Sequence, residues 1–378
     1  MNKEKWVLIG PVYPYKGGIS HYTGLMYRSL SKKYDVEMIS YKMQYPKLLF
    51  KKEQRDYSND SFKVLDTKFW INTANPFNII AVARRIVKMN PGKVIIQWWH
   101  PYFAPCVKIL TSVIKRAGIE VVFICHNVFP HERFPFDKKL TRMALKSGDK
   151  YILHAKGEVD SLISIKKDAS IKVQVHPTYE AFNFENMSKD KARELLSIDN
   201  NEKIILFFGF VREYKGLKHL INALGYLKNN QEKSGNMPRL FIVGDFDGNK
   251  EEYLKLIEKN SIEDNVTVVD GYVPDREVEK YFSAANLVVL PYESATQSGI
   301  VQIAYGFRKP VIVTRVGGLP EVVEDMVTGL IVEPNDDEGL SKAISCFFDE
   351  ALEDKLVEGI KDREYRFSWD RMREALEE

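Results

Sequence analysis

The chain has 378 residues, a formal net charge of +3 and three cysteines. This length is too great for one ordinary core and indicates two domains. No stretch approaches the apolar length of a membrane span, and the first residues, MNKEKWVLIG, predict a strand rather than a signal peptide. Because Cys106, Cys125 and Cys346 show no CxxC spacing, the sequence predicts no disulfide framework, no zinc site and a reducing cytosolic compartment.

The small net charge conceals two halves of opposite sign. Residues 1–180 contain 30 Lys and Arg against 15 Asp and Glu, a net charge of +15, and the remainder carries −12. A basic domain favours nucleic acid, an anionic membrane surface or a phosphorylated ligand as its partner. Nucleic acid ranks last, because the chain contains no helix-turn-helix, RNP aromatic motif or zinc knuckle.

Short apolar runs alternate with helical stretches along the whole chain. In the first half the expected strands are Trp6–Ile9, Val36–Ile39, Val94–Gln97, Val121–Cys125, Tyr151–Leu153 and Ile171–Val175. In the second half they are Ile204–Phe208, Leu240–Val243, Val266–Val269, Leu287–Leu290, Val311–Thr314 and Leu330–Val332. Near-continuous apolar runs are typical of buried parallel strands, so the sequence predicts two doubly wound α/β domains.

The domain boundary is expected between His176 and Met187, where the sequence has neither helical nor strand periodicity and contains a proline. We therefore expect domains at 1–180 and 181–378, with the last helix, 364–378, packing back on the first domain. The segment Tyr41–Asp60 is basic and aromatic with little periodicity, and it predicts a long loop that is either a solvated insertion or a binding element.

Two segments of the first domain follow predicted strands and carry groups suited to a ligand. Pro14–His21, PYKGGISH, offers two glycines that allow close backbone approach, followed by a helix whose N-terminus points at the same place. His126 and Asn127 end the strand Val121–Cys125, where polar side chains face the ligand crevice of an open α/β sheet. His131, nearby, is interpreted as an ordinary loop histidine.

The second domain has two comparable segments. Phe207–Gly216, FFGFVREYKG, places Arg212 and Lys215 at a glycine turn between a strand and a helix, which suits either an anion or a solvated basic turn. Pro291–Pro310 begins with small polar residues and a helix near Ser298, followed by the turn at Gly317 and Gly318. Since both segments follow strands of one sheet, together they favour a diphosphate site.

Taken in order, these segments resemble the retaining glycosyltransferases of family 4, which share the two-domain GT-B fold. The resemblance spans nearly the whole chain and rests on a series of short motifs. They are GG and His at Gly17, Gly18 and His21, HN at His126 and Asn127, the turn from Gly209 to Lys215 and Gly216, KPVI at Lys309–Ile312, GGLPE at Gly317–Glu321, TGLIV at Thr328–Val332 and FSW at Phe367–Trp369.

The resemblance implies two Rossmann-like domains facing a cleft, with a nucleotide-sugar donor on the second domain and an acceptor on the first. It implies catalytic roles for His126, Arg212 and Lys215. For the donor it implies contacts from Gly17, Gly18, Asn127, Gly209, Tyr272, Val273, Glu293, Thr296, Gln297, Ser298, Gly299, Ile300 and Gln302, and for the acceptor contacts from His21, Trp98 and Trp99. No cofactor and no metal are expected, and the leaving phosphate would itself assist front-side transfer with retention.

The chain departs from the family at two places. The family's arginine directly follows the glycine, where this chain has Phe210, so Arg212 is expected to substitute for it. The family's paired glutamates fall on Ala295 and Ile303, and we expect Glu293, Gln302 and the SATQSG segment, Ser294–Gly299, to replace them with other donors.

Three alternatives stay open on the sequence. Asp245-Phe246-Asp247 is a DxD string of the kind that binds a metal in GT-A transferases. The missing glutamates leave room for a nucleotide-sugar epimerase or a non-catalytic sugar-binding homologue. UDP-sugars are the expected donors, with GDP-sugars next.

The basic first domain also predicts where the protein works. The segments YPKLLFKK, Tyr45–Lys52, and QWWHPYF, Gln97–Phe103, mix basic and apolar residues, and a helix from Pro76 places Phe77, Ile80, Ala83 and Val87 beside Arg84, Arg85 and Lys88. This helix suits either a membrane interface or packing on the sheet with a solvated basic edge. We expect peripheral attachment to the cytoplasmic face of the membrane and a lipid-linked saccharide acceptor in bacterial surface polysaccharide synthesis.

Overall fold

The computed structural model describes residues 3–48, 53–57, 60, 63–130, 136–179, 182–230, 237–246 and 248–378. Within these ranges the chain forms two compact units, one of Met1–His176 with Ser368–Glu378 and the other of Pro177–Phe367. Asp247, His131 and the end of the YPKLLFKK segment lie outside the described residues.

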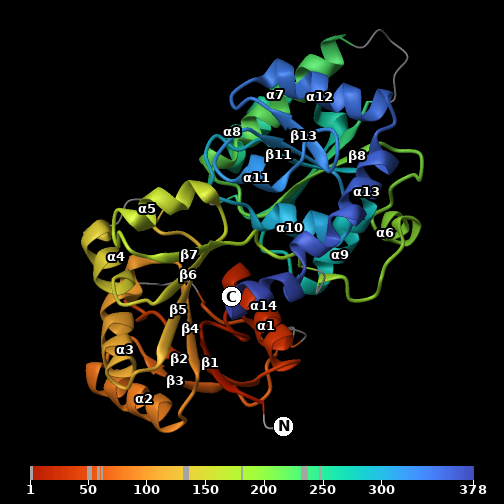
Figure 1. The fold of residues 1–378 in the computed structure, drawn as a ribbon. Helices are drawn as coiled ribbons and strands as arrows, with labels where there is room; N and C mark the ends of the chain where they lie inside the picture. The colour runs from red at the N-terminus through yellow and green to blue at the C-terminus, as the bar shows by residue number, and fades with distance from the viewer. Residues whose placement is uncertain are drawn as a thin grey trace. The chain divides into compact units, whose positions relative to one another are not determined.

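The first unit is built on a parallel sheet of seven strands in the order β3-β2-β1-β4-β5-β6-β7 (Figure 1). The strands are β1 (Lys5–Ile9), β2 (Asp35–Met43), β3 (Lys68–Asn72), β4 (Lys93–Trp98), β5 (Glu120–Cys125), β6 (Lys150–Leu153) and β7 (Ser170–Val173). The order of the first six is that of a Rossmann sheet, in which the chain reverses direction between β1 and β4. Ligands of such sheets bind beyond the carboxyl ends of the strands at this reversal.

Helices cover both faces of this sheet. They are α1 (Gly18–Ser31), α2 (Pro76–Lys88), α3 (Ala104–Arg116), α4 (Asp137–Leu145), α5 (Val159–Ile163) and α14 (Trp369–Glu377), with short 3₁₀ turns at Pro101–Phe103 and Lys156–Glu158. Because crossover connections are right-handed, α1 lies on the opposite face from α2, α3 and α4, which pack side by side. Apolar residues of β1, β4 and β5 are almost wholly buried between the two layers.

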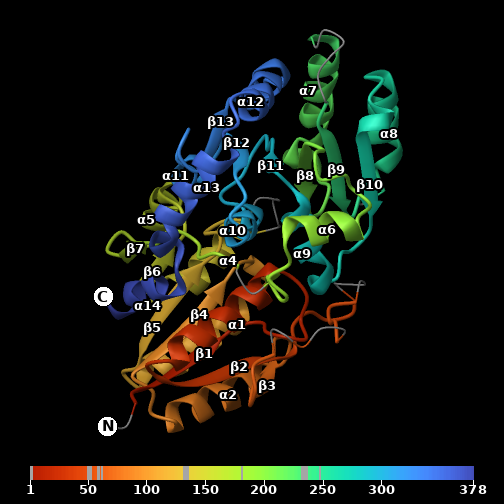
Figure 2. The same ribbon diagram turned by 90° about the vertical axis from the view of Figure 1, so that its right-hand side faces the viewer.

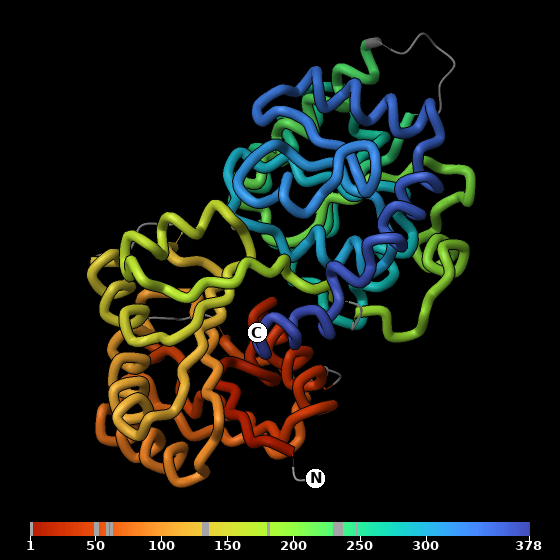
Figure 3. The backbone as a smooth tube through the Cα atoms, viewed as in Figure 1, coloured from red at the N-terminus to blue at the C-terminus, as the bar shows by residue number. Residues whose placement is uncertain are grey.

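The end of the chain belongs to the first unit. Helix α14 packs against α1, as Figure 3 shows by the blue terminal segment beside the red one. The Trp369 ring lies 5.0 Å from the Tyr22 ring, and the Ser29 hydroxyl donates to the carbonyl of Trp369 at 3.0 Å. The Lys93 ammonium donates to the carbonyl of Leu376, near the end of α14.

The second unit has a parallel sheet of six strands in the order β10-β9-β8-β11-β12-β13 (Figure 2). The strands are β8 (Ile204–Phe208), β9 (Arg239–Gly244), β10 (Val266–Asp270), β11 (Leu287–Leu290), β12 (Val311–Thr314) and β13 (Gly329–Val332). Here the chain reverses between β8 and β11, so the ligand crevice is expected beyond the carboxyl ends of these two strands.

Two groups of helices surround the second sheet. The helices are α6 (Lys189–Leu195), α7 (Leu217–Asn230), α8 (Lys250–Lys259), α9 (Asp275–Ala284), α10 (Gly299–Gly306), α11 (Leu319–Val322), α12 (Asp337–Asp349) and α13 (Glu353–Asp362), with 3₁₀ turns at Glu213–Lys215, Glu263–Asn265 and Glu364–Phe367. Helix α7 packs against α8 and α12, and α6 packs against α9. The two doubly wound α/β domains expected from the sequence are confirmed.

Two expected features differ from the structure. Tyr41–Met43 continue β2 instead of beginning a loop, because Tyr41 and Met43 pair with Ile71 and Asn72 of β3. The sequence reading missed β3 itself, whose sequence KFWIN is short and directly follows polar residues. Farther along the expected loop, Arg55 forms a bridge with Tyr15 in the segment that follows β1.

A buried arginine joins several loops of the second unit. Arg193 of α6 is 1% exposed, and its guanidinium donates to the carbonyls of Ala284, Asp199, Asn200 and Glu202. It also donates to the Oδ1 of Asn286 at 2.9 Å. These acceptors lie in the segment before β8, at the end of α9 and just before β11, so one side chain joins the amino ends of the two central strands.

We expect Arg193→Met to destabilise the second unit by roughly 3–5 kcal/mol, the range for removing one partner of a buried charged network. The methionine fills the space but leaves buried carbonyls without a donor. Urea unfolding followed by circular dichroism measures the effect. Lys191→Met on the same helix is the control, because Lys191 is exposed and pairs only with Glu194. Equal unfolding midpoints for the two variants would contradict this expectation.

Candidate functional site

Glycines shape the turn that follows β8. Gly209 has a φ of 99°, and its N–H donates to the carbonyl of Val243 in β9 at 2.9 Å. Gly216 has a φ of 65°, and a Cβ there would lie 2.0 Å from the carbonyl oxygen of Pro291. Only glycine tolerates both constraints. The turn is therefore held tightly between β9 and the segment that follows β11.

Lys215 is buried in this turn. Its residue is 9% exposed, and its Nζ would lie 3.3 Å from a Cβ placed on Gly209, close to the side chain of Ile300. The ammonium lies 5.9 Å from the centre of the Tyr292 ring. Among the described residues it makes no ion pair and no hydrogen bond. Burial, and secondly the neighbouring Arg212, lower the pKa of Lys215 to about 8.

The N-terminus of α10 lies at the same place. The Ser298 hydroxyl accepts a hydrogen bond from the N–H of Ile300 at 3.2 Å and lies 3.3 Å from the Tyr292 hydroxyl. Ile300 also contacts the Cβ position of Gly209, beside Lys215. The first N–H groups of a helix favour an anion. The structure thus brings Lys215, Gly209, Gly299 and Ile300 together at the reversal point of the sheet.

The loop after β12 supports the segment that leads to α10. Gly317 has a φ of 49°, and a Cβ there would lie 1.5 Å from the carbonyl oxygen of Ala295. The N–H of Gly318 donates to the carbonyl of Thr296 at 2.8 Å. Thr296 and Gln297 are half-buried in this segment. The expected turn at Gly317 and Gly318 therefore fixes the path of the chain toward Ser298.

Glu293 is held by the side chains of Lys218 and His219. Its Oε1 pairs with the Lys218 ammonium at 2.7 Å and with Nε2 of His219 at 3.2 Å, while Nδ1 of His219 lies 2.5 Å from Asp337. The hydrogen bond from Lys218 lowers the pKa of Glu293. Its N–H donates to the carbonyl of Tyr214 at 2.7 Å. Glu293 thus joins the segment after β11 to the glycine turn.

Gln302 occupies a different environment from Glu293. It is 1% exposed on α10, and its carbonyl accepts the N–H of Tyr179 at 3.3 Å. Its side-chain Oε1 is buried and has no partner among the described residues. Tyr272 and Val273 follow β10, the edge strand, two strands away from β8. The structure does not bring these two residues to Lys215.

The glycine segment of the first unit follows β1 at the reversal point of its own sheet. Gly17 has a φ of 103°, and α1 begins at Gly18. A Cβ at Gly17 would meet nothing within 4 Å, so the backbone conformation requires glycine here while space does not. His21 is half-buried on the first turn of α1.

His126 follows β5 and is buried. Its Nε2 lies 2.7 Å from the Oε1 of Gln97, and its ring packs against Tyr22 at 4.7 Å between ring centres. Burial lowers the pKa of His126 well below its usual value, so the ring is neutral at physiological pH. Asn127, the next residue, is half-buried.

Two further histidines that the sequence reading missed join His126. His154 and His176 follow β6 and β7, and their rings lie 5.6 Å and 6.3 Å from His126, with Tyr22 packed against all three. Burial lowers the pKa of His154 to about 4. A histidine after each of three successive predicted strands was a signal available in the sequence.

Trp98 cannot contact an acceptor as expected. It is 1% exposed in the core, and its indole N–H donates to the carbonyl of Val128 at 3.3 Å. Trp98 is the last residue of the buried strand β4, and its side chain packs in the core, whereas Trp99 begins the following loop. Trp99 is half-buried, with its ring 4.3 Å from that of Phe103.

Helix α2 uses a different apolar face from the one expected at a membrane. Its core contacts are Ile79, Val82, Ala83 and Ile86, so Ala83 is unavailable to lipid. Phe77 is 84% exposed, and Arg84, Arg85 and Lys88 are exposed with it. The outer face therefore combines one large apolar side chain with three cations. Across the described chain, every helix is too short or too polar to pass through a bilayer.

The described residues contain no cluster of histidine, cysteine, aspartate or glutamate suited to hold a metal ion. Asp245 follows β9, and its carbonyl accepts the N–H of Val211 at 2.8 Å. This bond ties the DxD segment to the glycine turn after β8.

A family model matches part of the chain. Residues 188–363 match the model described as Glycosyl transferases group 1. The D-inositol 3-phosphate glycosyltransferase of Acidothermus cellulolyticus is 28% identical over 206 residues, which cover 53% of this chain and 46% of that protein. An uncharacterized glycosyltransferase of Methanocaldococcus jannaschii is 27% identical over 223 residues, covering 57% and 54%. The chain thus spans about half the length of the curated relatives it matches.

Solved structures extend the similarity to the whole chain. A glycosyltransferase from Rickettsia africae has a TM-score of 0.71 and 22% identity, with 100% of this chain and 98% of that one covered. HepE of Anabaena, solved with UDP and glucose, has a TM-score of 0.72 and 16% identity, with 99% of each chain covered. At these identities the similarity concerns the fold. The comparisons therefore relate residues 188–363 to the glycosyl transferases of group 1 and give the whole chain the two-domain fold of solved glycosyltransferases.

Proposed function

We propose that the protein is a retaining glycosyltransferase that moves a hexose from a nucleotide diphosphate sugar to a saccharide acceptor. The observation that carries this proposal is the buried ammonium of Lys215, which has no carboxylate partner among the described residues and lies beside the N-terminus of α10. A buried cation is costly unless an anion joins it. A diphosphate supplies that anion.

The same arrangement suits the departure of a nucleoside diphosphate. Negative charge grows on the leaving phosphate during transfer, and preorganised donors stabilise that charge without moving themselves. Lys215, Arg212 and the N–H group of Gly299 are such donors. Glu293 and His219 hold the turn in place in this proposal, since Oε1 of Glu293 is paired with Lys218 and His219, and Nδ1 of His219 is paired with Asp337.

We favour UDP as the nucleotide. We also propose that the protein belongs to family 4 and transfers the sugar with retention of stereochemistry. Support for UDP comes from HepE, which was solved with UDP and with UDP-glucose. His126 is proposed to orient the sugar through its neutral imidazole. The side chain of Gln97 holds this ring by a hydrogen bond at Nε2 of His126. Measuring sugar transfer from a panel of UDP- and GDP-sugars tests the activity, and donor binding without transfer or epimerisation would favour a non-catalytic sugar-binding protein.

The acceptor is proposed to be a lipid-linked saccharide on the first unit, at the cytoplasmic face of the membrane, in bacterial surface polysaccharide synthesis. The exposed face of α2, with Phe77 and three cations, supports attachment to an anionic surface. Trp99 and His21 are the acceptor contacts retained from the sequence analysis.

We expect Lys215→Met to weaken binding of UDP-glucose by roughly 1.5–3 kcal/mol, the range for a hydrogen bond to a charged group. Arg212→Ala should weaken it by a similar amount. Isothermal titration calorimetry measures both effects. Lys342→Met, an exposed residue of α12 paired with Glu338, is the control and should bind as the unaltered protein does. Unchanged affinity in Lys215→Met would remove the basis of the proposed function.

We also expect the affinity for UDP to decrease as the pH rises from 8 to 10. Because the pKa of Lys215 in the free protein is about 8, the ammonium must regain its proton to bind the diphosphate above that pH. The loss should approach about tenfold per pH unit. Titrations across this range should show the dependence in the unaltered protein and not in Lys215→Met. The same slope in both proteins would show that another group is responsible.

For the membrane we expect binding to vesicles that contain anionic lipid, with less binding at high salt. Each Lys or Arg near an anionic leaflet contributes about 1 kcal/mol, so the charge reversal in Arg84→Glu with Arg85→Glu should strongly reduce co-sedimentation. Lys138→Glu with Lys139→Glu on α4 is the matched control, since both residues are exposed on the same unit. Equal binding to neutral vesicles would contradict attachment through charge.

A further inference from the structure

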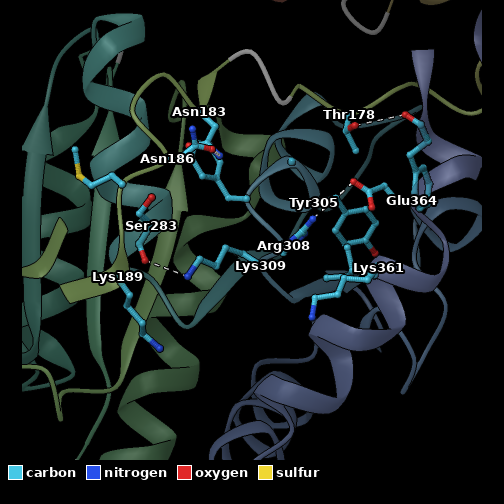
Figure 4. A pocket seen from close by; sticks show the side chains of 15 residues that line it. Thr178, Asn183, Asn186, Lys189, Ser283, Tyr305, Arg308, Lys309, Lys361 and Glu364 are labelled. Carbon is cyan, nitrogen blue, oxygen red and sulfur yellow. Dashed lines mark hydrogen bonds and ion pairs between the residues drawn. The ribbon is translucent and has the colours of Figure 1, made fainter. Parts of the chain in front are cut away.

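The second unit contains a cavity of about 490 Å³ away from the glycine turn (Figure 4). It lies between the end of α9, the connection from α10 to β12, the end of α13 and the segment 183–189. Lys215 lies near the N-terminus of α10, whereas this cavity adjoins its C-terminal end at Tyr305 and Gly306. Its volume is in the range of small-molecule sites.

The charged residues of the cavity wall are mostly cations. Lys189, Arg308, Lys309 and Lys361 line it together with a single carboxylate, that of Glu364. Lys189 pairs with Glu353 at 2.9 Å and Lys361 with Glu358 at 3.0 Å, and neither of these two glutamates lines the cavity. The wall is therefore electropositive, which favours an anionic ligand.

Lys309 is the cation of the cavity wall that pairs with no carboxylate among the described residues. Its Nζ donates to the carbonyl of Ser283 at 3.0 Å, as the dashed line in Figure 4 shows, and it makes no ion pair among the described residues. Burial, and secondly the charge of Lys189, lower the pKa of Lys309 to about 8. A lysine ammonium has three donors, and the carbonyl uses one of them.

Arg308 is paired only loosely. Its guanidinium lies 3.9 Å from the Oε1 of Glu364, and both side chains are more than half exposed (Figure 4). An exposed pair at this distance contributes little to stability. A phosphate that entered the cavity could therefore take the place of Glu364 at a small cost. Arg308 and Lys309 both line the cavity, with Arg308 directed toward Glu364 and Lys309 toward Ser283 (Figure 4).

The walls are fixed without a ligand. The buried carboxylate of Glu279 accepts the N–H groups of Phe184, Glu185 and Met187, which anchors the segment that carries Asn183 and Asn186. On the other side, the Tyr305 hydroxyl donates to Thr328 at 2.8 Å. Such preorganisation reduces the entropy lost on binding.

We propose that this cavity binds a small phosphate monoester, held by Lys309 and Arg308, as a site separate from the diphosphate site. The charge of the wall selects a dianion, the bidentate guanidinium of Arg308 matches phosphate oxygens, and the volume leaves room for a group of sugar size. The ligand would also lie against Thr178 and Phe367, which are joined by a hydrogen bond of 2.9 Å at the two ends of the unit.

Glucose 6-phosphate and inorganic phosphate, titrated separately into the full chain by calorimetry, test the proposal. We expect saturable binding of glucose 6-phosphate at millimolar concentration or below. Arg308→Ala and Lys309→Met should each weaken it at least about tenfold. Lys215→Met and the exposed control Lys342→Met should bind it as the unaltered protein does. Equal affinity for inorganic phosphate would identify the phosphate group alone as the ligand chemistry.

Two results would overturn the proposal. One is the absence of saturable binding of either probe to the unaltered protein. The other is loss of binding in Lys215→Met with retention in Arg308→Ala, which would place the probe at the diphosphate site. Because Arg308 is more than half exposed, its variant should fold even if Lys309→Met does not. This test is independent of the proposed transferase activity, since it measures binding of a phosphate and requires no sugar transfer.

Discussion

The proposed diphosphate site depends on the buried ammonium of Lys215, which pairs with no carboxylate among the described residues. A shift of the Lys215 pKa from 10.5 to about 8 corresponds to roughly 3 kcal/mol that disfavours the charged form. The fold tolerates this because glycines bring the backbone close around it: Gly209 lies under the ammonium, and Gly216 lies against Pro291. Side chains at either position would force the loops apart and admit water. The same burial that disfavours the charged form of Lys215 in the free protein leaves its ammonium able to bind a phosphate.

The neighbouring polar groups have a supporting part. Lys218 and His219 pair with Glu293, and His219 also pairs with Asp337. This network links α7, α12 and the segment after β11. The side chains of this network pair with one another, whereas Lys215 makes no ion pair among the described residues. Substitution of Glu293 would therefore release Lys218 and His219 of α7, while the backbone bond from residue 293 to Tyr214 would remain.

Much of the fold and part of the site followed from the sequence. The apolar runs predicted twelve of the thirteen strands in the described part of the chain, because buried parallel strands exclude polar residues. The glycine turn at Lys215 and the start of α10 at Ser298 were predicted because each follows directly from a strand. The burial of Trp98 was missed, since residue type alone does not distinguish the last residue of a strand from the first of a loop. Glu293 was assigned to a ligand because its partners, Lys218 and His219, lie far from it in the chain.

Net charge alone would have predicted neither proposed anion site. Residues 181–378 carry a net charge of −12, which should repel phosphates at long range. Near each site, however, the carboxylates are engaged. Glu293 is held by Lys218 and His219, Glu353 by Lys189 and Asn286, and Glu279 by three backbone N–H groups. Salt screens exposed charges that are separated by more than about 10 Å, while interactions of buried groups persist. Local pairing, and not the charge of the unit, therefore decides where an anion binds.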